Sequence, residues 1–195
     1  MIGLNHIRFA YGDKTVFSDL SFTVKDGECL CLQGPSGQGK TTAARILTGL
    51  ETAQNGKVTA PATASWVFQE DRLIPHLSVL HNVTLALPKE KREDAVALLE
   101  EAGLGEVLKQ KPALLSGGMK RRVAIVRAVA FGGDALILDE PFNGLDRDTK
   151  KIMASMIRRE FLSKGKPVLL ISHVEEDAEL MNATIFSIKP KDALQ

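Results

Sequence analysis

Residues 34–41 read Gly-Pro-Ser-Gly-Gln-Gly-Lys-Thr and constrain the fold of this 195-residue chain more than any other stretch. They fit the pattern G-x-x-x-x-G-K-[ST], whose glycines let backbone N–H groups turn inward around a polyphosphate. An apolar run at 28–33 precedes them and an apolar-periodic segment at about 40–50 follows, which predicts strand, loop and helix. The helix N-terminus adds partial positive charge beside a bound phosphate. The stretch therefore predicts a nucleotide-binding α/β protein.

The residue types at the end of this loop indicate individual roles. Lys40 is expected to contact the β- and γ-phosphates, Thr41 to place its hydroxyl on Mg²⁺, and Thr42 to add a phosphate contact. The alternative, a glycine-rich strand-to-helix turn without a ligand, does not need the complete pattern. The nucleotide-binding residues predicted from this stretch are Gly34, Pro35, Ser36, Gly37, Gln38, Gly39, Lys40, Thr41 and Thr42.

Asp139 and Glu140 form an acidic pair directly after the apolar run at 135–138. Open α/β folds bind ligands at the carboxyl edge of the parallel sheet, so both carboxylates are expected beside the phosphate loop. There, Asp139 would hold Mg²⁺ and Glu140 would polarise the attacking water. A solvated acidic strand end is the alternative interpretation.

Hydrophobic periodicity predicts one α/β domain over residues 1–195, with a mostly parallel core sheet, an N-terminal antiparallel β part and an inserted α-helical part. The core is expected at 1–69 and 133–195, and the helical part at 70–132. Strands are predicted at 2–9, 15–24, 28–33, 64–68, 135–139, 167–172 and 183–188, helices at about 40–50, 78–86, 90–102, 116–131 and 147–164, and a turn at 55–56.

Charge, cysteine positions and hydropathy restrict the binding partners and the cellular compartment expected for the protein. Lys and Arg number 25 against 24 Asp and Glu, so the net charge of +1 gives no global attraction to nucleic acid or anionic lipid. Cys29 and Cys31 would share one strand face, which favours buried thiols in a reducing compartment. No run approaches the ~18 apolar residues of a membrane span, and the first residues lack signal-peptide character, which indicates a soluble, cytoplasmic protein.

Residues 115–119 read Leu-Ser-Gly-Gly-Met and open a predicted helix well downstream of the phosphate loop. Locally, Ser116 fits an N-cap, with two glycines at the start of the helix. The basic residues at 120–122 and Arg127 follow. An exposed basic helix face near bound phosphate is preferred for them over a nucleic-acid surface. A second anion-binding helix start in one small domain requires an explanation beyond capping.

Taken together, these motifs resemble those of ABC-type ATPase subunits. The phosphate loop, Gln69, residues 115–119, 136–141 and 144–146, and His173 stand in the order and approximate spacing of that family, over essentially the whole chain. The resemblance implies ATP and Mg²⁺ as ligands. It also implies a head-to-tail pair of chains around two ATP molecules, in which the partner is a second copy of this chain or a paralogous ATPase subunit.

In that arrangement the signature at 115–119 serves the partner's nucleotide. The resemblance implies that Ser116, Gly117 and Gly118 complete the partner's site in trans, and that Asp146 bridges the interface between the two chains. Met119 departs from the family, which most often has Gln there. Because the serine and the glycines make the phosphate contacts, the departure is expected to be tolerated.

The resemblance also implies roles for three residues outside the loop and the signature. Tyr11 would stack on adenine, with a plain hairpin-turn tyrosine as the alternative. Gln69 would sense Mg²⁺ and the attacking water. His173 would contact the γ-phosphate, with a structural histidine at a strand end as the alternative.

Residues 68–79 resemble the hinge segment of the nitrate, sulfonate and taurine importer subunits. The resemblance implies that this segment receives a helix of a transmembrane permease subunit; ordinary packing within the helical part is the alternative. It further implies an extracytoplasmic substrate-binding protein and a peripheral location on the inner face of the cell membrane. The predicted docking residues are Arg72, Leu73, Ile74, Pro75 and Leu77.

The sequence thus predicts an ATP-hydrolysing subunit of an ABC membrane transporter, with an importer favoured over an exporter. A soluble ABC ATPase acting on DNA or ribosomes is the rival, although such proteins usually carry two cassettes or long coiled-coil insertions. A phosphoryl-transfer kinase shares the phosphate loop but has no use for the 115–119 signature. Direct nucleic-acid binding is not expected, and the transported molecule would be selected by other subunits.

Overall fold

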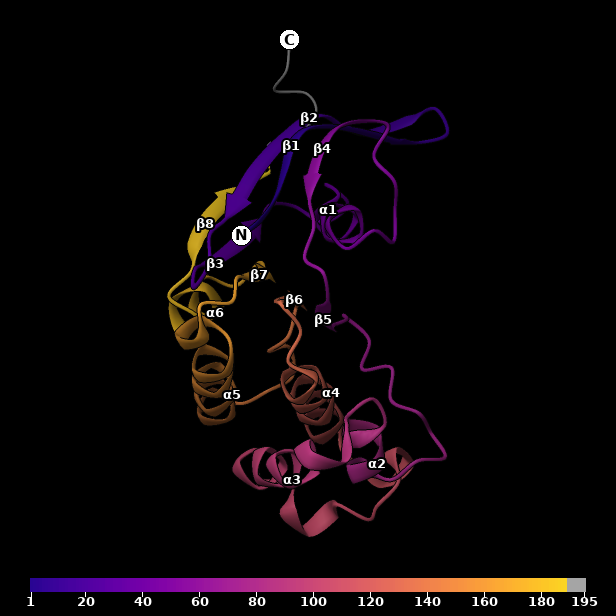
Figure 1. Ribbon diagram of the computed structural model, residues 1–195, viewed down its shortest axis with the longest axis vertical. Coiled ribbons are helices and arrows are strands. Elements are labelled where there is room, and N and C mark those ends of the chain that lie inside the picture. Colours follow the sequence, from indigo (N-terminus) through magenta and orange to yellow (C-terminus); the bar gives the residue numbers. More distant parts are fainter. Residues whose placement is uncertain (189–195) are drawn as a thin grey trace.

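Five parallel strands form the central sheet of the computed structural model, which describes residues 1–188 (Figure 1). Their spatial order is β5-β6-β7-β3-β8, and every neighbouring pair runs parallel. The strands are β3 (Cys29–Gln33), β5 (Ala64–Val67), β6 (Ala135–Asp139), β7 (Val168–Ile171) and β8 (Thr184–Ser187). Because parallel strands share one carboxyl edge, the residues that follow β3, β5, β6 and β7 come together there.

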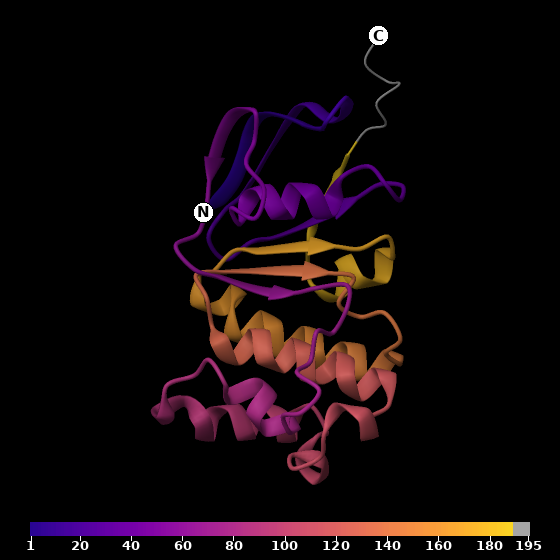
Figure 2. The ribbon, with the colours of Figure 1, turned by 90° about the vertical axis from the view of Figure 1, so that its right-hand side faces the viewer.

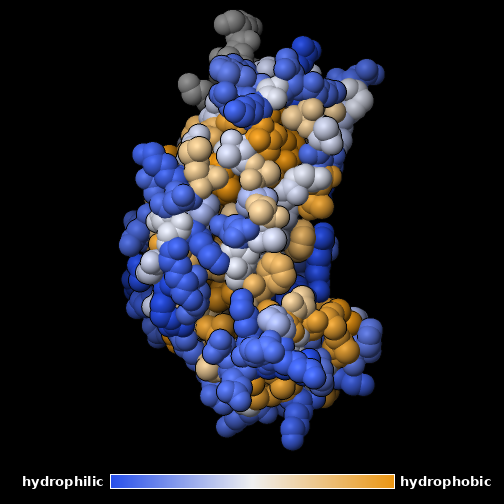
Figure 3. Space-filling model, viewed as in Figure 1, coloured by the Kyte–Doolittle hydropathy of each residue, from blue (hydrophilic) through white to orange (hydrophobic). Residues whose placement is uncertain are grey.

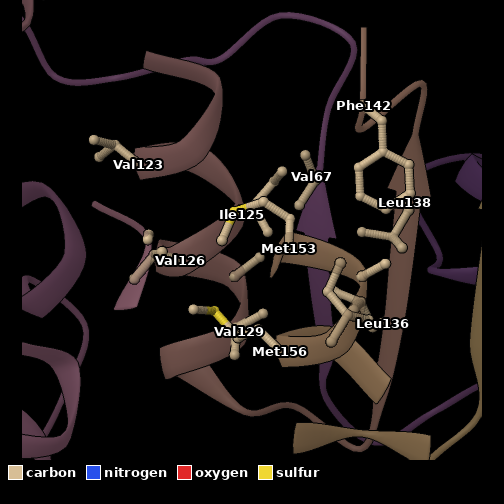
Figure 4. Packing of buried hydrophobic residues seen from close by; sticks show 14 of the residues in the cluster. Val67, Val123, Ile125, Val126, Val129, Leu136, Leu138, Phe142, Met153 and Met156 are labelled. Carbon is tan, nitrogen blue, oxygen red and sulfur yellow. The ribbon is translucent and has the colours of Figure 1, made fainter. Parts of the chain in front are cut away.

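Hydrophobic cores lie on both faces of this sheet, which explains why its inner strands β6 and β7 are buried throughout, whereas the edge strand β8 is largely exposed. Along β6, Leu136 and Leu138 face one core and Ile137 faces the other. Helix α1 (Lys40–Leu47) covers one face, while α4 (Gly117–Phe131) and α5 (Arg147–Glu160) cover the other (Figure 2). Ile125 of α4 and Met153 of α5 belong to the same cluster as Leu136 and Leu138 (Figure 4).

The two cysteines lie on β3, and both side chains enter the core that α4 and α5 cover. Both thiols are free and buried. Burial raises the pKa of Cys31 to about 11 and that of Cys29 still further, so both thiols stay protonated at neutral pH. The prediction that both cysteines are buried core thiols is confirmed.

A separate antiparallel sheet of order β2-β1-β4 packs over α1. It contains the predicted hairpin, β1 (Ile2–Tyr11) with β2 (Lys14–Val24), and adds β4 (Asn55–Thr59). The predicted turn at 55–56 is therefore wrong, because both residues belong to β4. Gly56 has φ of +98°, and a Cβ atom there would lie 2.4 Å from the carbonyl oxygen of His6. The glycine allows β4 to approach β1 where the pairing register shifts.

Three helices lie between β5 and β6 in the chain, namely α2 (Val79–Thr84), α3 (Arg92–Glu101) and α4, close to the predicted ranges. Helices α2 and α3 lie at the end of the molecule opposite the antiparallel sheet, and α4 lies between them and the central sheet (Figures 1 and 2). Short 3-10 turns in the same part of the chain are η1 (Lys89–Lys91), η2 (Gly105–Val107) and η3 (Pro112–Leu114). A further one, η4 (Leu162–Lys164), follows α5. The boundaries of the helical part at 70 and 132 stay a prediction. None of the helices in residues 1–188 is long and apolar enough to cross a membrane.

Two helical details differ from the expectation. Helix α5 ends at Glu160 instead of 164, and the following η4 turn is closed by Gly165 with φ of +71°. Helix α6 (Glu175–Leu180) was not predicted. It follows β7 after only a few residues, and its residues Asp177 and Ala178 are buried.

Candidate nucleotide site

The phosphate loop joins β3 to α1, as predicted, and curls around its own lysine. The Lys40 ammonium donates to the carbonyl oxygens of Gly34 at 2.7 Å and Pro35 at 3.0 Å. Gly39, the N-cap of α1, has φ of +87°, and a Cβ atom there would lie 2.5 Å from Cγ1 of Val16. Only glycine fits both the left-handed backbone and the close approach of β2. The loop backbone is therefore fixed in a turn around the ammonium.

A cleft of about 260 Å³ opens beside this loop. Tyr11, at the end of β1, shares the cleft wall with the loop, so the structure brings these two predicted elements together. Tyr11 is 44 % exposed, its ring meets that of Phe9 edge-on at 4.8 Å between ring centroids, and its hydroxyl donates to Glu51 at 3.1 Å. The cleft is lined by Tyr11, Lys14, Val16, Gly37, Gly39, Lys40, Thr41 and Thr42. Stacking of adenine on Tyr11 stays a prediction.

Thr41 and Asp139 join the loop to the carboxyl end of β6. The Thr41 hydroxyl donates to Oδ2 of Asp139 at 2.8 Å, and Asp139 is buried. Burial raises the pKa of this carboxyl above its ordinary value, and the Thr41 hydrogen bond opposes the rise. An adjacent hydroxyl and carboxylate beside a phosphate loop are the oxygen donors that Mg²⁺ takes together with phosphate oxygens. These residues fit the predicted metal.

Glu140 and His173 face each other across the same edge. Nδ1 of His173 lies 2.8 Å from Oε1 of Glu140, and the histidine side chain is 65 % exposed. The second carboxylate oxygen of Glu140, Oε2, is buried and has no hydrogen-bond partner within residues 1–188. Glu140 thus keeps one oxygen able to accept a proton while His173 fixes the other. Glu140 and His173, both predicted to act in hydrolysis, are thus brought together, and their roles stay predictions.

Gln69 follows β5 and reaches this network through its backbone. Its carbonyl oxygen accepts a hydrogen bond from Nη2 of Arg121 at 2.6 Å, while its side chain is exposed. Arg121 also corrects the interpretation of residues 120–122 as an exposed basic face, because it is only 6 % exposed. Arg121 precedes the buried Ile125 and Ala128 by four and seven residues, so the three lie on one face of the helix. This spacing could have indicated from the sequence that Arg121 is buried.

Ser116, the first residue of the signature motif, is the N-cap of α4. Its hydroxyl accepts from the backbone N–H of Met119 at 3.2 Å. Gly118 lies against the segment before α5, since a Cβ atom there would be 3.6 Å from the carbonyl oxygen of Gly144. The Met119 side chain packs against the hydrophobic core, which gives the unusual methionine a structural use. Action of this turn on a second chain's nucleotide stays a prediction.

Asp146 caps α5, a use that the sequence reasoning missed. Its Oδ1 accepts from the backbone N–H groups of Asp148 and Thr149 at 3.1 and 2.9 Å, and its Oδ2 accepts from the Thr149 hydroxyl at 2.6 Å. These bonds hold the pKa of Asp146 below its ordinary value. The Asp-x-x-Thr spacing before an amphipathic helix was the available signal. The side chain remains exposed, so the predicted interface role is compatible with the cap.

A buried network behind His173 was also missed. Asp177 of α6 accepts from the Ser172 hydroxyl at 2.8 Å and from Nζ of Lys150 at 2.9 Å. The Ser172 hydroxyl in turn accepts from the backbone N–H of Val174 at 3.1 Å. The side chains of Asp177 and Lys150 are 1 % and 14 % exposed. The network ties the His173 loop to both α5 and α6.

The predicted docking segment lies along a groove of about 590 Å³ between the sheet and the helical part. Of the five predicted residues, Arg72 and Ile74 line this groove. The Arg72 guanidinium lies 4.0 Å from the ring centroid of Phe68, which stacks on Trp66 at 4.7 Å. A hydrophobic area is exposed near α2 (Figure 3). Leu85, which directly follows α2, is 64 % exposed.

The other three predicted docking residues have different surroundings. Pro75 is exposed, Leu77 is half-buried, and Leu73 packs against the hydrophobic core. Asn82, which is 2 % exposed, fixes this stretch by bonding to the backbone N–H of Ile74 at 2.7 Å and to the carbonyl of Leu77 at 3.2 Å. Docking at these residues stays a prediction.

A phosphate loop after β3, with an acidic pair at the end of β6 in the same parallel sheet, defines a P-loop nucleoside triphosphatase. The profile of the ABC transporter family matches residues 17–143, and this chain belongs to that family. Its membership makes the chain an ATP-binding ATPase, as predicted.

Relatives and solved structures agree with this assignment. The aliphatic sulfonates import ATP-binding protein SsuB 1 of Rhodococcus jostii is 40 % identical over 93 % of this chain and 75 % of that protein. SsuB 2 of Frankia alni is 40 % identical over 92 % and 74 %. A bacterial ABC transporter cassette solved as a dimer has a TM-score of 0.82 and 27 % identity, over 96 % of this chain and 95 % of that one. The predicted likeness to the sulfonate importer group is confirmed, and the DNA or ribosome alternative is not favoured.

Proposed function

We propose that this chain is the ATPase subunit of an importer, and that two ATPase chains close head-to-tail on ATP to drive a transmembrane permease subunit. The observation that carries the proposal is the juxtaposition of Thr41 with Asp139 and of Glu140 with His173 at one sheet edge. Import is the function named for the SsuB relatives. The transported molecule is selected by subunits other than this one.

Each residue at the edge performs one part of ATP hydrolysis in this proposal. The loop N–H groups and Lys40 bind the phosphates, and Thr41 and Asp139 would hold Mg²⁺. When bound, that ion neutralises charge on the phosphate oxygens. Glu140 accepts a proton from the attacking water through Oε2, which has no hydrogen-bond partner among residues 1–188, while His173 orients the carboxylate through Oε1. Gln69 lies at the end of the neighbouring strand β5, where it would respond to the ion and the water.

The signature turn supplies the second half of each site. Ser116 presents its hydroxyl at an exposed helix start, where N–H groups and the helix dipole favour phosphate. We place Gly117 and Gly118 beside the partner's γ-phosphate and Asp146 at the interface. The groove beside Arg72 and Ile74 would take the permease helix on the inner face of the membrane. A substrate-binding protein outside the membrane would complete the importer.

Substitution of Glu140 tests the proposal. Glu140→Gln keeps the shape of the side chain but removes the proton acceptor, so ATP turnover should fall by about 100-fold or more while ATP binding is retained. Size-exclusion chromatography should then show an ATP-dependent dimer. Glu179→Gln, on exposed α6 surface, should hydrolyse ATP like the unsubstituted chain and not accumulate the dimer. Unchanged turnover in Glu140→Gln, or no dimer with ATP, would refute the assignment.

A further inference from the structure

Arg121 occupies a buried position between the helical part and the catalytic sheet edge. Its Nη1 donates to the carbonyl of Phe68 at 2.7 Å, and its Nη2 donates to the carbonyls of Gln69 at 2.6 Å and Glu140 at 3.3 Å. Nη1 also lies 3.3 Å from Oδ1 of Asp71. One planar guanidinium therefore binds three backbone carbonyls and one carboxylate, a pattern that a lysine ammonium cannot reproduce.

These contacts join three segments that are distant in the sequence. Phe68 and Gln69 follow β5, Glu140 follows β6, and Arg121 lies in the second turn of α4, five residues after its N-cap Ser116. An α-helix transmits displacement along its axis as a rigid element. A shift at the start of α4 therefore acts on both strand ends through Arg121.

Arg121 contacts the backbone of Glu140, which has a strained conformation. Glu140 has φ of +48°, in the left-handed region that side chains other than glycine rarely adopt. Such a conformation persists where its surroundings hold it. Here the Glu140 N–H donates to the carbonyl of Ile171 at 2.9 Å, and the Glu140 carbonyl accepts from Arg121. Arg121 thus supports the peptide that aims the catalytic carboxylate.

We propose that Arg121 is a positioning residue that couples engagement of the Ser116 signature turn to the alignment of Glu140 and Gln69. The inference rests on the proposed ATPase role. It adds that phosphate contact at the start of α4 affects, through Arg121, the position of the residues that hydrolyse ATP. The neighbouring arginine differs: Nη1 of Arg122 donates to the carbonyl of Ala102, inside the helical part, at 2.6 Å. Arg122 is therefore a matched control on the same helix.

Steady-state ATPase kinetics of Arg121→Lys and Arg122→Lys test the proposal, since both keep the charge and replace the guanidinium fork. Arg121→Lys should lower kcat about tenfold with KM for ATP within about twofold, because alignment is lost without loss of ground-state binding. Arg122→Lys should leave kcat and KM within about twofold. Equal effects of the two substitutions, or an unchanged kcat in Arg121→Lys, would overturn the proposal.

A double-mutant cycle isolates the coupling itself. In a Ser116→Ala background, Arg121→Lys should lower kcat less than about threefold, because the signal it relays is already weakened. A full tenfold effect there would show that Arg121 acts independently of the signature, against the proposal.

Folding is monitored by thermal unfolding. If Arg121→Lys does not fold, Asp71→Asn replaces it: this change removes only the carboxylate beside Nη1 and should lower kcat about threefold at constant KM. An unchanged kcat in a folded Asp71→Asn variant would then overturn the inference. Absence of ATPase activity in the unsubstituted chain would refute the proposed function instead, so the two failures are distinguishable.

Discussion

The sheet edge and the start of α4 both carry residues assigned to ATP chemistry, but they are built differently. At the sheet edge each side chain has a partner from another element: Thr41 of α1 bonds to Asp139 of β6, and Glu140 faces His173 after β7. At the start of α4, Ser116 bonds only within its own first turn among the contacts of residues 1–188. The first region is assembled by tertiary structure, and the second is a local motif displayed outward.

This difference gives the two regions different sensitivities. A site assembled from several elements loses alignment when a supporting residue far away in the sequence is changed. A local helix start keeps its shape through its own cap and hydrogen bonds. Substitution of a residue that supports the sheet edge from behind should therefore lower stability and activity together, whereas substitution at the signature should lower activity with a smaller loss of stability.

The largest effect is expected behind His173. Asp177→Ala leaves the Lys150 ammonium and the Ser172 hydroxyl without their buried partner, so the free energy of unfolding should fall by about 3 kcal/mol. Because Ser172 precedes His173, ATPase activity should fall in the same variant. Urea unfolding and steady-state kinetics measure the two losses.

Glu176→Ala is the matched control for that substitution. Glu176 is the neighbouring acid, 42 % exposed, and lies 3.9 Å from the same Lys150 ammonium. A partly exposed pair contributes little, so its loss should cost at most about 1 kcal/mol and leave activity unchanged. Equal losses in the two variants would mean that burial of Asp177 has no special role.

The same contrast explains what could be predicted from the sequence. The phosphate loop, the acidic pair and the parallel strands were predicted because each is a short local pattern whose place in an α/β fold follows from the shared carboxyl edge of the sheet. Ser116 as an N-cap was likewise a local inference, and the structure confirms it. Residue types and hydrophobic periodicity are sufficient to predict a structure where the residues within one short motif determine its conformation.

What was missed depends on partners distant in the chain. The Lys150–Asp177 pair spans 27 residues, and Arg121 meets Phe68 across 53, so neither has a sequence pattern that names its partner. Strand β4 was missed because Gly56, a turn signal by type, is needed here for close approach to β1. In each case tertiary contact overrides the local preference of the residue.

An intermediate effect is expected at the signature. Ser116→Ala should cost about 1 kcal/mol of stability through the lost cap, and ATPase activity should fall about tenfold because a phosphate donor is lost from the partner's site. Ser78 offers a matched comparison, since its hydroxyl caps α2 in the same way by accepting from the His81 N–H at 3.2 Å. Ser78→Ala should lose similar stability with full activity. If both serines affect turnover equally, capping alone explains Ser116.

The smallest stability effect, with the opposite sign, is expected at Asp139. Burial raises the pKa of this carboxyl in the folded protein, so ionisation is harder there than in the unfolded chain. The folded state then holds more protons, and Asp139 lowers stability as the pH rises above the ordinary carboxyl range. Asp139→Asn can still accept from Thr41 and should raise the melting temperature at pH 7 by a few degrees at most, a gain that shrinks toward pH 4, while ATPase activity is lost. Melting curves at both pH values measure the effect; a gain that grows on acidification would contradict the raised pKa.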